Sequence, residues 1–423
     1  MTRDVRLAYG ERGLVVRVPD GATVVEPLWV DAVADPYAEV QRALRETEAG
    51  PPLRERVRPG QTVAISVCDV TRPQPRELMV TAVLAELEGV VAPEDVTVLV
   101  ATGTHRGNTR EELVRMLGED LLSRVRVVNH DCRDEESLVW CGTYGDGVPV
   151  WLNRLWVEAD VRITTGFVEP HFFAGFSGGP KMVAPGLAGL ETVLTLHDAA
   201  RIGSPQATWA VCEGNPVHDD VRAVADGTGT TFALDVLLNR DQQVVQAFGG
   251  DLLAMHEVAR ARAKELAMVP VPALFDVVVT TNASYPLDQN LYQAVKGMTA
   301  AAAVVKPGGV IVCAAECRDG FPDHGSFREV LAEADSPQAL LDVIAARERT
   351  VPDQWQVQVL ARVLVRAQVQ VYSELADEDL RSAHLGAATS VEDAVEAALA
   401  AAGPGATLCV LPEDPMTIAY VDA

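Results

Sequence analysis

The sequence predicts an α/β protein of two domains with mostly parallel sheets. Its 423 residues exceed what a single hydrophobic core usually supports. Apolar residues make up 48% of the chain but aromatic residues only 5%, which is typical of helices packed on parallel sheets rather than of a β-sandwich. Short apolar runs alternate along the chain with helix-like segments, as expected of βαβ units.

The charge and hydropathy of the chain argue against two classes of partner. It carries 35 basic and 60 acidic residues, for a net charge of −25, and no basic stripe compensates locally. Such a surface would repel the phosphate backbone of nucleic acid. No basic-then-apolar leader is visible, and no window approaches the roughly 20 apolar residues of a membrane span. We therefore expect a soluble cytoplasmic protein with neither nucleic acid nor a membrane as a partner.

Cysteine and histidine give different signals. The seven cysteines are scattered without a close CxxC pair, which argues against a structural zinc site and a disulfide framework. Half of the eight histidines fall in or near loop-like sequence. These four are His105, His171, His197 and His218, and the last, at the start of a helix, is expected to be structural.

Polar residues follow the first buried strand. After a helix over residues 35–46, the run TVAISVCD at 62–69 predicts that strand. The loop behind it contains Asp69, Thr71 and Arg72. An arginine in this position can hold a carboxylate or phosphate by a two-pronged contact. The alternative is an aspartate that caps the next helix and pairs with a surface arginine.

A second strand and helix repeat this arrangement. The run VTVLVATG at 96–103 predicts a strand, and Thr109 with Glu112 predicts a capping box at the start of the next helix. His105 lies on the loop between them. Two loops at the carboxyl ends of neighbouring strands form a crevice, so we expect His105 to face it, although a structural histidine is the alternative.

A glycine-rich loop follows the fourth predicted strand. Residues 159–167 predict the strand, and EPHFFAGFSGGPK at 169–181 predicts the loop, with His171 and Lys181 inside it and His197 sixteen residues further on. Glycines let the backbone approach a ligand closely, so we expect a cofactor here. The alternative is a solvated lysine beside an ordinary Gly-Gly turn.

The proline-broken segment near residue 270 predicts a domain boundary. We expect an N-terminal domain over 1–270, to which residues 404–423 return, and a C-terminal domain over 271–403, with the active site in the cleft between them. The second domain predicts a βαβ unit whose helix begins near residue 291. On that helix Tyr292 and Lys296 share a face, and Gln293 and Lys296 are neighbours three positions apart, although a solvated lysine is again the alternative.

Six ordered motifs resemble the nickel-pincer lactate racemases over essentially the whole chain. They are DVTRP at 69–73, GTHR at 103–106, PHFFAGFSGGPK at 170–181, His197, YQAVK at 292–296 and Trp355. The spacing from His171 to Lys181 to His197 also matches that family.

The resemblance implies a cofactor. It is a nickel-pincer nucleotide, the Ni(II) complex of pyridinium-3,5-bisthiocarboxylic acid mononucleotide, joined covalently through Lys181. His197 matches the metal ligand, and sulfur and carbon donors with one imidazole suit the square-planar preference of Ni(II). Asp69, Thr71 and Arg72 match the segment that contacts the cofactor. Cofactor-biosynthesis enzymes are then implied as partners for loading.

The resemblance also implies a reaction: racemisation or epimerisation of a 2-hydroxy acid, lactate or a relative, by proton-coupled hydride transfer through a 2-keto acid. The α-proton of such a carboxylate is too weakly acidic for a side-chain base, and hydride transfer avoids the carbanion. His105 and His171 match the catalytic acid–base pair. The residues that match substrate contacts or pocket walls are Arg72, Tyr292, Gln293, Lys296 and Trp355.

Two other functions stay open on the sequence. Lys181 could form a Schiff base with pyridoxal phosphate, or the chain could be a noncatalytic carrier of the nickel cofactor. Pro180 and Gly107 are positions without a clear match to the lactate-specific members, so the resemblance leaves the side chain of the hydroxy acid open.

Overall fold

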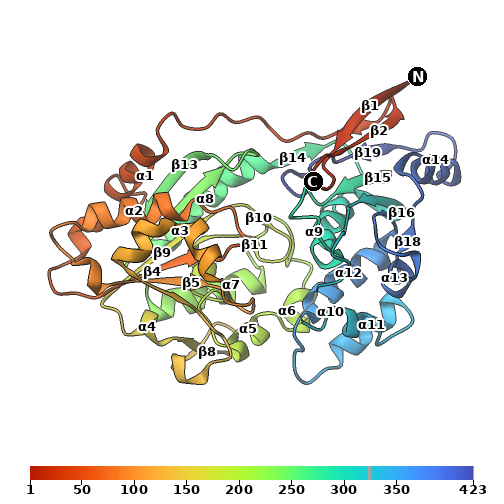
Figure 1. The fold of residues 1–423 in the computed structure, drawn as a ribbon. Coiled ribbons are helices and arrows are strands. Elements are labelled where there is room, and N and C mark those ends of the chain that lie inside the picture. The colour runs from red at the N-terminus through yellow and green to blue at the C-terminus, as the bar shows by residue number, and fades with distance from the viewer. Residues whose placement is uncertain (323–324, 423) are drawn as a thin grey trace. The chain divides into compact units, whose positions relative to one another are not determined.

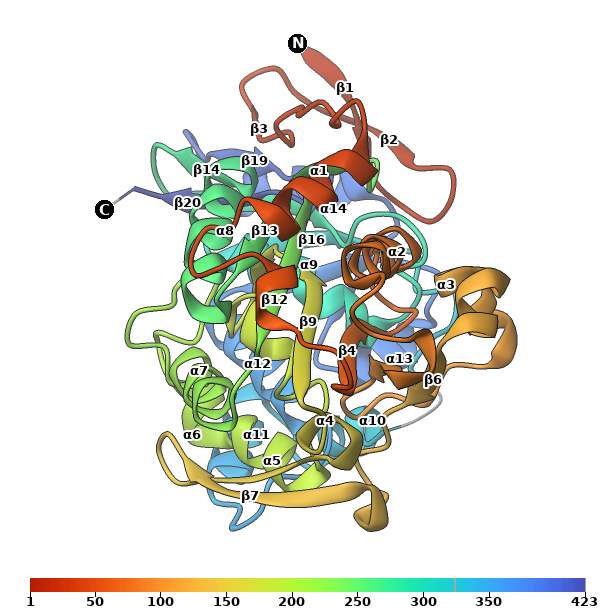
Figure 2. The same ribbon diagram turned by 90° about the vertical axis from the view of Figure 1, so that its left-hand side faces the viewer.

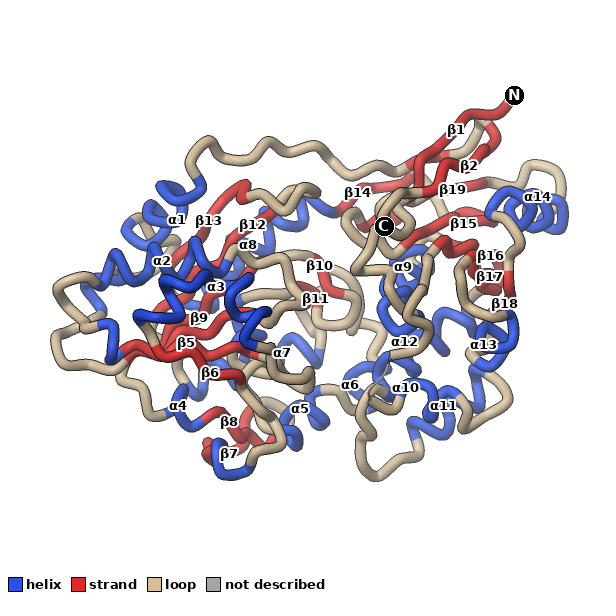
Figure 3. Tube along the Cα trace, viewed as in Figure 1, coloured by secondary structure: helices blue, strands red, loops and turns tan. Residues whose placement is uncertain are grey.

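The structure is a computed structural model that describes residues 1–322 and 325–422. Its contacts divide the chain into two compact units. Unit 1 contains Met1–Leu28, Asp198–Ser204 and Ala267–Ala423, and unit 2 contains Trp29–His197 and Pro205–Leu266. Each unit is built on a sheet with helices on its faces (Figures 1 and 3), so the predicted α/β fold with mostly parallel sheets is confirmed. Among the described helices, none combines the length and the apolar character that crossing a membrane requires.

Unit 2 has a six-stranded sheet in which five strands are parallel and the edge strand β13 is antiparallel to its neighbour. Figure 2 shows β12, β9 and β4 side by side. In spatial order the strands are β13 (Val244–Gly250), β12 (Phe232–Leu238), β9 (Val161–Phe167), β4 (Val63–Cys68), β5 (Val96–Ala101) and β6 (Arg126–Asn129).

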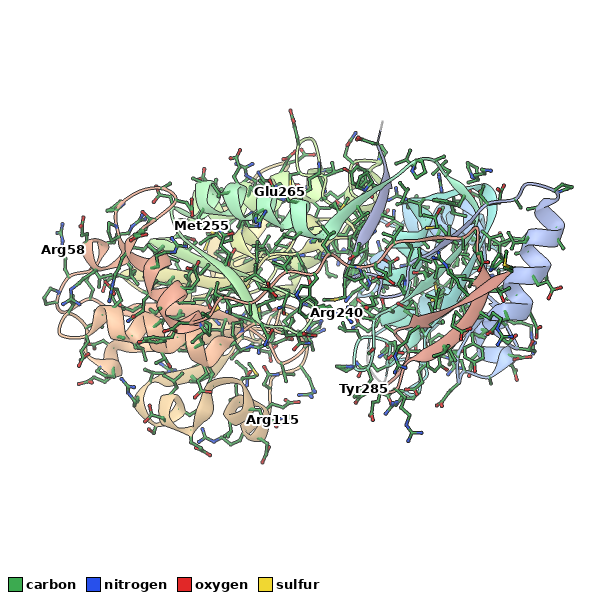
Figure 4. All side chains as sticks on the ribbon, turned by 90° about the horizontal axis from the view of Figure 1, so that it is seen from above. Arg58, Arg115, Arg240, Met255, Glu265 and Tyr285 are labelled. Carbon is green, nitrogen blue, oxygen red and sulfur yellow. The ribbon has the colours of Figure 1, made fainter. Side chains whose placement is uncertain are left out.

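Both faces of this sheet are covered. Successive side chains of β4 point to opposite faces, so Ile65 and Ala64 belong to different hydrophobic clusters. One face packs on α1 (Pro36–Arg45), α2 (Arg76–Leu87) and α3 (Arg110–Arg124). The other packs on α5 (Leu190–Leu196), α7 (Pro216–Thr228), α8 (Leu252–Ala267) and the hairpin of β7 (Leu138–Tyr144) and β8 (Val148–Asn153). Within α8, Met255 is buried in this second cluster and Glu265 is exposed (Figure 4).

The helix starts follow the local sequence. The capping box predicted at α3 is confirmed, because the Glu112 amide donates to Thr109 Oγ1 at 3.3 Å and the Thr109 amide donates to Glu112 Oε2 at 2.8 Å. Gly118, at φ 74°, interrupts the helical conformation inside α3. The shorter elements of unit 2 are η1 (Leu53–Arg56), η2 (Pro93–Asp95), η3 (Glu135–Ser137) and α4 (Arg154–Val157).

Unit 1 has a six-stranded parallel sheet. In spatial order its strands are β18 (Gly386–Ala387), β17 (Gln368–Tyr372), β16 (Val305–Ala314), β15 (Phe275–Thr281), β19 (Leu408–Val410) and β3 (Thr23–Val24). Two strand pairs accompany the sheet: the hairpin of β1 (Thr2–Leu7) and β2 (Leu14–Pro19), and β14 (Met268–Val271) with β20 (Ile418–Val421). The helices are α6 (Ala199–Gly203), α9 (Leu291–Ala302), α10 (Phe327–Leu331), α11 (Pro337–Ala345), α12 (Gln354–Arg366), α13 (Asp377–Ser382) and α14 (Val391–Ala402).

The division of the chain differs from the expected boundaries at both ends. Residues 1–28 and 404–422 belong to unit 1, whereas the sequence suggested that both accompany the first domain. The reason is strand pairing: β3 pairs with β19, β19 pairs with β15, and β20 pairs with β14. Strands of two to four residues carry too little periodicity to reveal their partners in advance.

Helix α9 packs directly on the backbone at the end of β15. A Cβ added at Gly297 would overlap the carbonyl oxygen of Thr281. Alanine is normally the better helix former by about 1 kcal/mol, but at this position we expect Gly297→Ala to destabilise the protein by about 1–3 kcal/mol, because a backbone atom cannot move aside. Chemical denaturation measures the change, with Gly21→Ala as control, since nothing lies within 4 Å of a Cβ there. Equal midpoints for the two variants would contradict this account of the packing.

Candidate active site

The carboxyl ends of the central strands of unit 2 place the predicted site residues on neighbouring loops. In the parallel register Cys68 of β4 pairs with Ala101 of β5, so Asp69 and His105 follow strands that end at the same edge. Ligands of open α/β sheets bind at this edge. The loop that follows β9, at residues 168–181, completes the set.

Asp69 and His105 form a hydrogen-bonded pair. His105 Nδ1 lies 2.7 Å from Asp69 Oδ2, and Asp69 Oδ1 accepts from the Thr71 hydroxyl at 2.6 Å and amide at 3.1 Å. The buried Asp69 therefore fixes the orientation of the half-exposed imidazole. Helix α2 has Pro75 as its N-cap residue and no side-chain cap, so the structure does not contain the alternative of a helix-capping aspartate.

The environment of Asp69 keeps it ionised. Burial alone would raise its pKa, but the hydrogen bond and charge of His105, the charge of Arg72 and the hydrogen bond from Thr71 outweigh burial and lower the pKa to about 2. The folded-state pKa lies below the unfolded value, so the stabilisation is present above pH 4 and is lost only as the pH falls from about 4 to about 2. At neutral pH the pair has a fixed anion behind the imidazole.

Arg76, the first residue of α2, supports this loop, and the sequence analysis missed it. Its buried guanidinium donates to the carbonyl oxygens of Cys68 at 2.7 Å and Gln74 at 3.0 Å, and also to those of Asp69 and Arg72. One side chain thus holds the whole turn between β4 and α2. A cation in the first turn of a helix interacts unfavourably with the helix dipole. This unusual position was the only signal in the sequence that Arg76 has a particular role.

His171 lies next to the turn of a short hairpin of β10 (Pro170–His171) and β11 (Gly175–Phe176). Its Nδ1 faces the amides of Phe173 and Ala174 at 3.4 and 3.3 Å. A nitrogen that accepts from amides carries the lone pair, so the proton of the neutral ring belongs on Nε2. The ring stacks on Phe172 at 4.8 Å between centroids.

Phe173 is the common neighbour of three predicted site residues. Its ring centroid lies 4.6 Å from that of His171, 5.4 Å from that of His197 and 5.8 Å from Lys181 Nζ. Three side chains from positions 171, 181 and 197 of the chain thus lie around a single aromatic ring. The structure brings these three side chains, which the family resemblance implies belong to one site, to the same ring.

A backbone hydrogen bond fixes the tautomer of His197. It ends α5, and its buried ring donates from Nδ1 to the carbonyl oxygen of Val193 at 2.7 Å. The lone pair is then on Nε2, as in metal sites where the second nitrogen of histidine bonds a carbonyl. Among residues 1–322 and 325–422 no group of three His, Cys, Asp or Glu side chains could hold a metal ion by itself. The Nε2 lone pair of His197 can serve as one ligand of a metal.

The segment that carries Lys181 is tied to the central strands. Lys181 lies in η4 (Gly179–Met182), whose Met182 carbonyl accepts from Ser66 of β4 at 2.9 Å. The Gly186 amide donates to the Lys181 carbonyl at 3.1 Å, and the Gly186 carbonyl accepts from the Gly103 amide at 3.1 Å. Because Gly103 belongs to the loop of His105, the lysine segment and that loop share one hydrogen-bonded framework.

The four remaining predicted residues lie in unit 1 and form two hydrogen-bonded pairs. Trp355 Nε1 of α12 donates to the Tyr292 hydroxyl of α9 at 3.3 Å, and Lys296 Nζ donates to Gln293 Oε1 at 2.7 Å. The sequence analysis missed Gln356, which donates to the Tyr292 carbonyl at 2.6 Å. It also missed Phe327, whose ring packs edge-on against Tyr292 at 5.3 Å. Lys296 is therefore half-buried and hydrogen-bonded rather than a solvated lysine.

Comparison with known proteins identifies relatives over the full length. The family model described as the lactate racemase N-terminal domain matches residues 9–210, and the lactate racemase C-terminal domain matches residues 271–418. The chain is 36% identical over 416 residues to the lactate racemase of Lactiplantibacillus plantarum, covering 97% of this chain and 98% of that protein. It is 40% identical over 333 residues to the lactate racemase of Thermoanaerobacterium thermosaccharolyticum, covering 78% of each.

Comparison with solved structures also finds a lactate racemase. The lactate racemase apoprotein from Thermoanaerobacterium thermosaccharolyticum superposes with a TM-score of 0.91 at 33% identity, covering 99% of this chain and 100% of that chain. A protein from Thermotoga maritima has a TM-score of 0.67 at 18% identity, covering 91% of this chain and 98% of that chain. The second similarity concerns the fold alone.

Proposed function

The chain belongs to the lactate racemase family of isomerases, and we propose that it interconverts the enantiomers of lactate or a closely related 2-hydroxy acid. The observation that carries the proposal is the grouping of His171, His197 and Lys181 around Phe173. Two imidazoles and an amine beside one ring suit an acid–base group, a metal ligand and a point of covalent attachment. The family assignment removes the main support for a pyridoxal phosphate enzyme.

The residues of unit 2 fit the nickel-pincer nucleotide. Lys181 offers the amine for covalent attachment on a glycine-rich turn, and His197 offers Nε2 to the metal because Val193 holds its Nδ1 proton. We propose that Asp69, Thr71 and Arg72 contact the nucleotide on the neighbouring loop. When bound, this cofactor supplies an electrophile that takes the α-hydrogen of the substrate with its electron pair and returns it, so that the substrate passes through a 2-keto acid.

The two histidines move the hydroxyl proton. One of the two, His105 or His171, takes the hydroxyl proton as the substrate is oxidised, and the other donates a proton as the opposite enantiomer forms. Each histidine therefore serves as base in one direction and as acid in the other. Asp69 keeps the His105 proton on Nδ1, which leaves Nε2 to exchange protons. A buried anion also stabilises the imidazolium that forms during the reaction.

The substrate is a carboxylate, and the chain offers cations for it. We propose that Arg72, Gln293 and Lys296 bind the carboxylate, and that Tyr292 and Trp355 exclude water from the keto acid. Cofactor-biosynthesis enzymes would load the nucleotide before turnover.

Chiral analysis of a loaded sample tests the proposal. The chain, co-expressed with cofactor-making enzymes, is incubated with pure L-lactate and pure D-lactate, and both should approach a racemic mixture. In D2O the α-carbon should keep its original hydrogen, because a hydride does not exchange with solvent, whereas proton abstraction would introduce deuterium. A fully loaded sample that leaves lactate and related hydroxy acids unchanged would refute the activity.

Asp69 provides a test of the orienting pair. We expect Asp69→Asn to lower kcat by about 10- to 100-fold, because a neutral amide can offer a proton to Nδ1 and so favours the wrong tautomer of His105. Chiral assays at saturating lactate measure the loss. The control is Asp160→Asn, an exposed aspartate that accepts from the Thr62 amide at 2.9 Å. Equal kcat for both variants would remove Asp69 from the proton path.

A further inference from the structure

Asp235 is a buried carboxyl beneath the loop that carries Lys181. It lies in β12 on the same face as Ala233 and Leu237, which is the face covered by α7 and α8, and none of it is exposed. Glycines make room for it on two sides: a Cβ at Gly166 would lie 2.8 Å from Asp235 Oδ1, and a Cβ at Gly178 would lie 2.8 Å from Oδ2.

Two buried side chains hold this loop on either side of Gly178. Asp235 Oδ2 accepts from the Gly179 amide at 2.7 Å, and His256 Nε2 of α8 donates to the Ser177 carbonyl at 2.9 Å. Gly178 and Gly179 have φ values of 71° and 49°, a left-handed conformation that favours glycine. A Cβ at Gly179 would also lie 2.5 Å from the His256 ring. The turn is therefore shaped by Asp235 and His256 together.

The hydrogen-bonding capacity of this buried carboxyl is only partly used. Asp235 Oδ1 has no partner at hydrogen-bonding geometry among the described residues. Burial raises the pKa of Asp235 to about 7, although the amides of Gly179 and Gly166 act in the opposite direction. A buried polar atom without a partner destabilises a fold, so Oδ1 is a cost that the strand carries while Oδ2 accepts from the Gly179 amide. The protein thus has a destabilising buried carboxyl at the position where β12 contacts the loop that carries Lys181.

Building on the proposed function, we propose that Asp235 and His256 are positioning residues that set the backbone of residues 177–181 so that Lys181 presents its amine to the cofactor. Neither touches the reacting atoms in this account. They act through the Gly179 amide and the Ser177 carbonyl, which stand two and four residues before the lysine.

Amide hydrogen exchange of the chain without cofactor tests the clamp itself. Peptides that cover residues 175–182 should exchange about tenfold faster in Asp235→Ala, because the Gly179 amide loses its acceptor, and Asp235→Asn, which keeps an acceptor oxygen, should restore the slow rate. Asp220→Ala is the matched control: Asp220 is a buried aspartate of α7 that accepts from the Asp146 amide at 2.7 Å. Unchanged exchange in Asp235→Ala would overturn the proposal.

Loading then tests the consequence for Lys181. The extent of covalent modification, read by peptide mass after co-expression with cofactor-making enzymes, should fall about tenfold in Asp235→Ala and recover in Asp235→Asn. If Asp235→Ala does not fold, the loading of His256→Phe is compared with that of His256→Gln. Phenylalanine loses the hydrogen bond to the Ser177 carbonyl, whereas glutamine can still donate it. Wild-type loading in the variants that lose the contact would overturn the inference. An unmodified wild-type chain would instead refute the proposed function, while the exchange result still decides on the clamp.

Discussion

His105→Gln and His171→Gln are each expected to lower lactate racemisation by about 10²- to 10⁴-fold, the usual contribution of a positioned acid or base. Glutamine keeps hydrogen-bonding capacity at these positions but cannot exchange a proton near neutral pH. Because neither residue is assigned to the metal or to covalent attachment, the modified Lys181 peptide should appear in both variants at the wild-type level. Chiral chromatography of time courses started from each enantiomer measures the loss.

The equilibrium constant between the enantiomers is one, and this value fixes the ratio of kcat/KM for the two enantiomers in each histidine variant. In any variant, kcat/KM for L-lactate must equal kcat/KM for D-lactate, so loss of one histidine cannot produce a one-way enzyme. Differences between the two directions can appear only in kcat and KM taken separately. Unequal kcat/KM values for the two enantiomers would therefore indicate an error in the assay.

The control for both variants is His384→Asn. His384 has a φ of 61°, a conformation that asparagine tolerates better than most residues, and it has no assigned part in the reaction. Turnover within threefold of wild type at equal loading, in either the His105 or the His171 variant, would exclude that histidine from the proton path.

The sheet at the centre of unit 2 could be predicted because its strands are short, buried on both faces and separated by helix signals. Once β4 and β5 are known to be parallel neighbours, Asp69 and His105 must lie at the same edge. That step needs no knowledge of side-chain conformation. The hydrogen bond of 2.7 Å between them is a detail that only coordinates supply.

Asp235 and Gln356 were not predicted as supports of the site, and the two share a reason. Asp235 is separated from Gly179 by 56 positions, and Gln356 from the Tyr292 carbonyl by 64. Their function depends on long-range contacts that leave no local pattern. Asp235 did carry one signal, since an acid in the otherwise apolar run FALDVLL is costly unless its carboxylate has a task.

The chain ends show a different limit. Parallel pairing of β3 with β19 joins Thr23 to Cys409, which lie almost at opposite ends of the sequence. A strand of two residues has no measurable periodicity, and the number of candidate partners grows with chain length. The assignment of residues 1–28 and 404–422 to unit 1 therefore required the fold itself.

The attachment site gives the second large expected effect, because the chain has only four lysines: Lys181, Lys264, Lys296 and Lys306. We expect Lys181→Arg to abolish covalent modification completely, since a guanidinium keeps the positive charge but cannot form the thioamide. His197→Gln should behave differently: the covalent mass should persist while nickel content falls, because this residue is assigned to the metal and not to the linkage. Intact-protein mass and metal analysis of the same loaded samples measure the two quantities separately.

Lys264→Arg is the matched control, since Lys264 is the other lysine of unit 2 and lies exposed near the end of α8. It should load as wild type does. Modification found at Lys264, or mass gained by Lys181→Arg, would show that the glycine-rich turn does not direct the attachment. The contrast between positions 181 and 197 is the stronger test, because a general loss of folding would remove mass and nickel together. Only separate roles for a linking amine and a ligating imidazole around Phe173 can remove nickel and keep the mass.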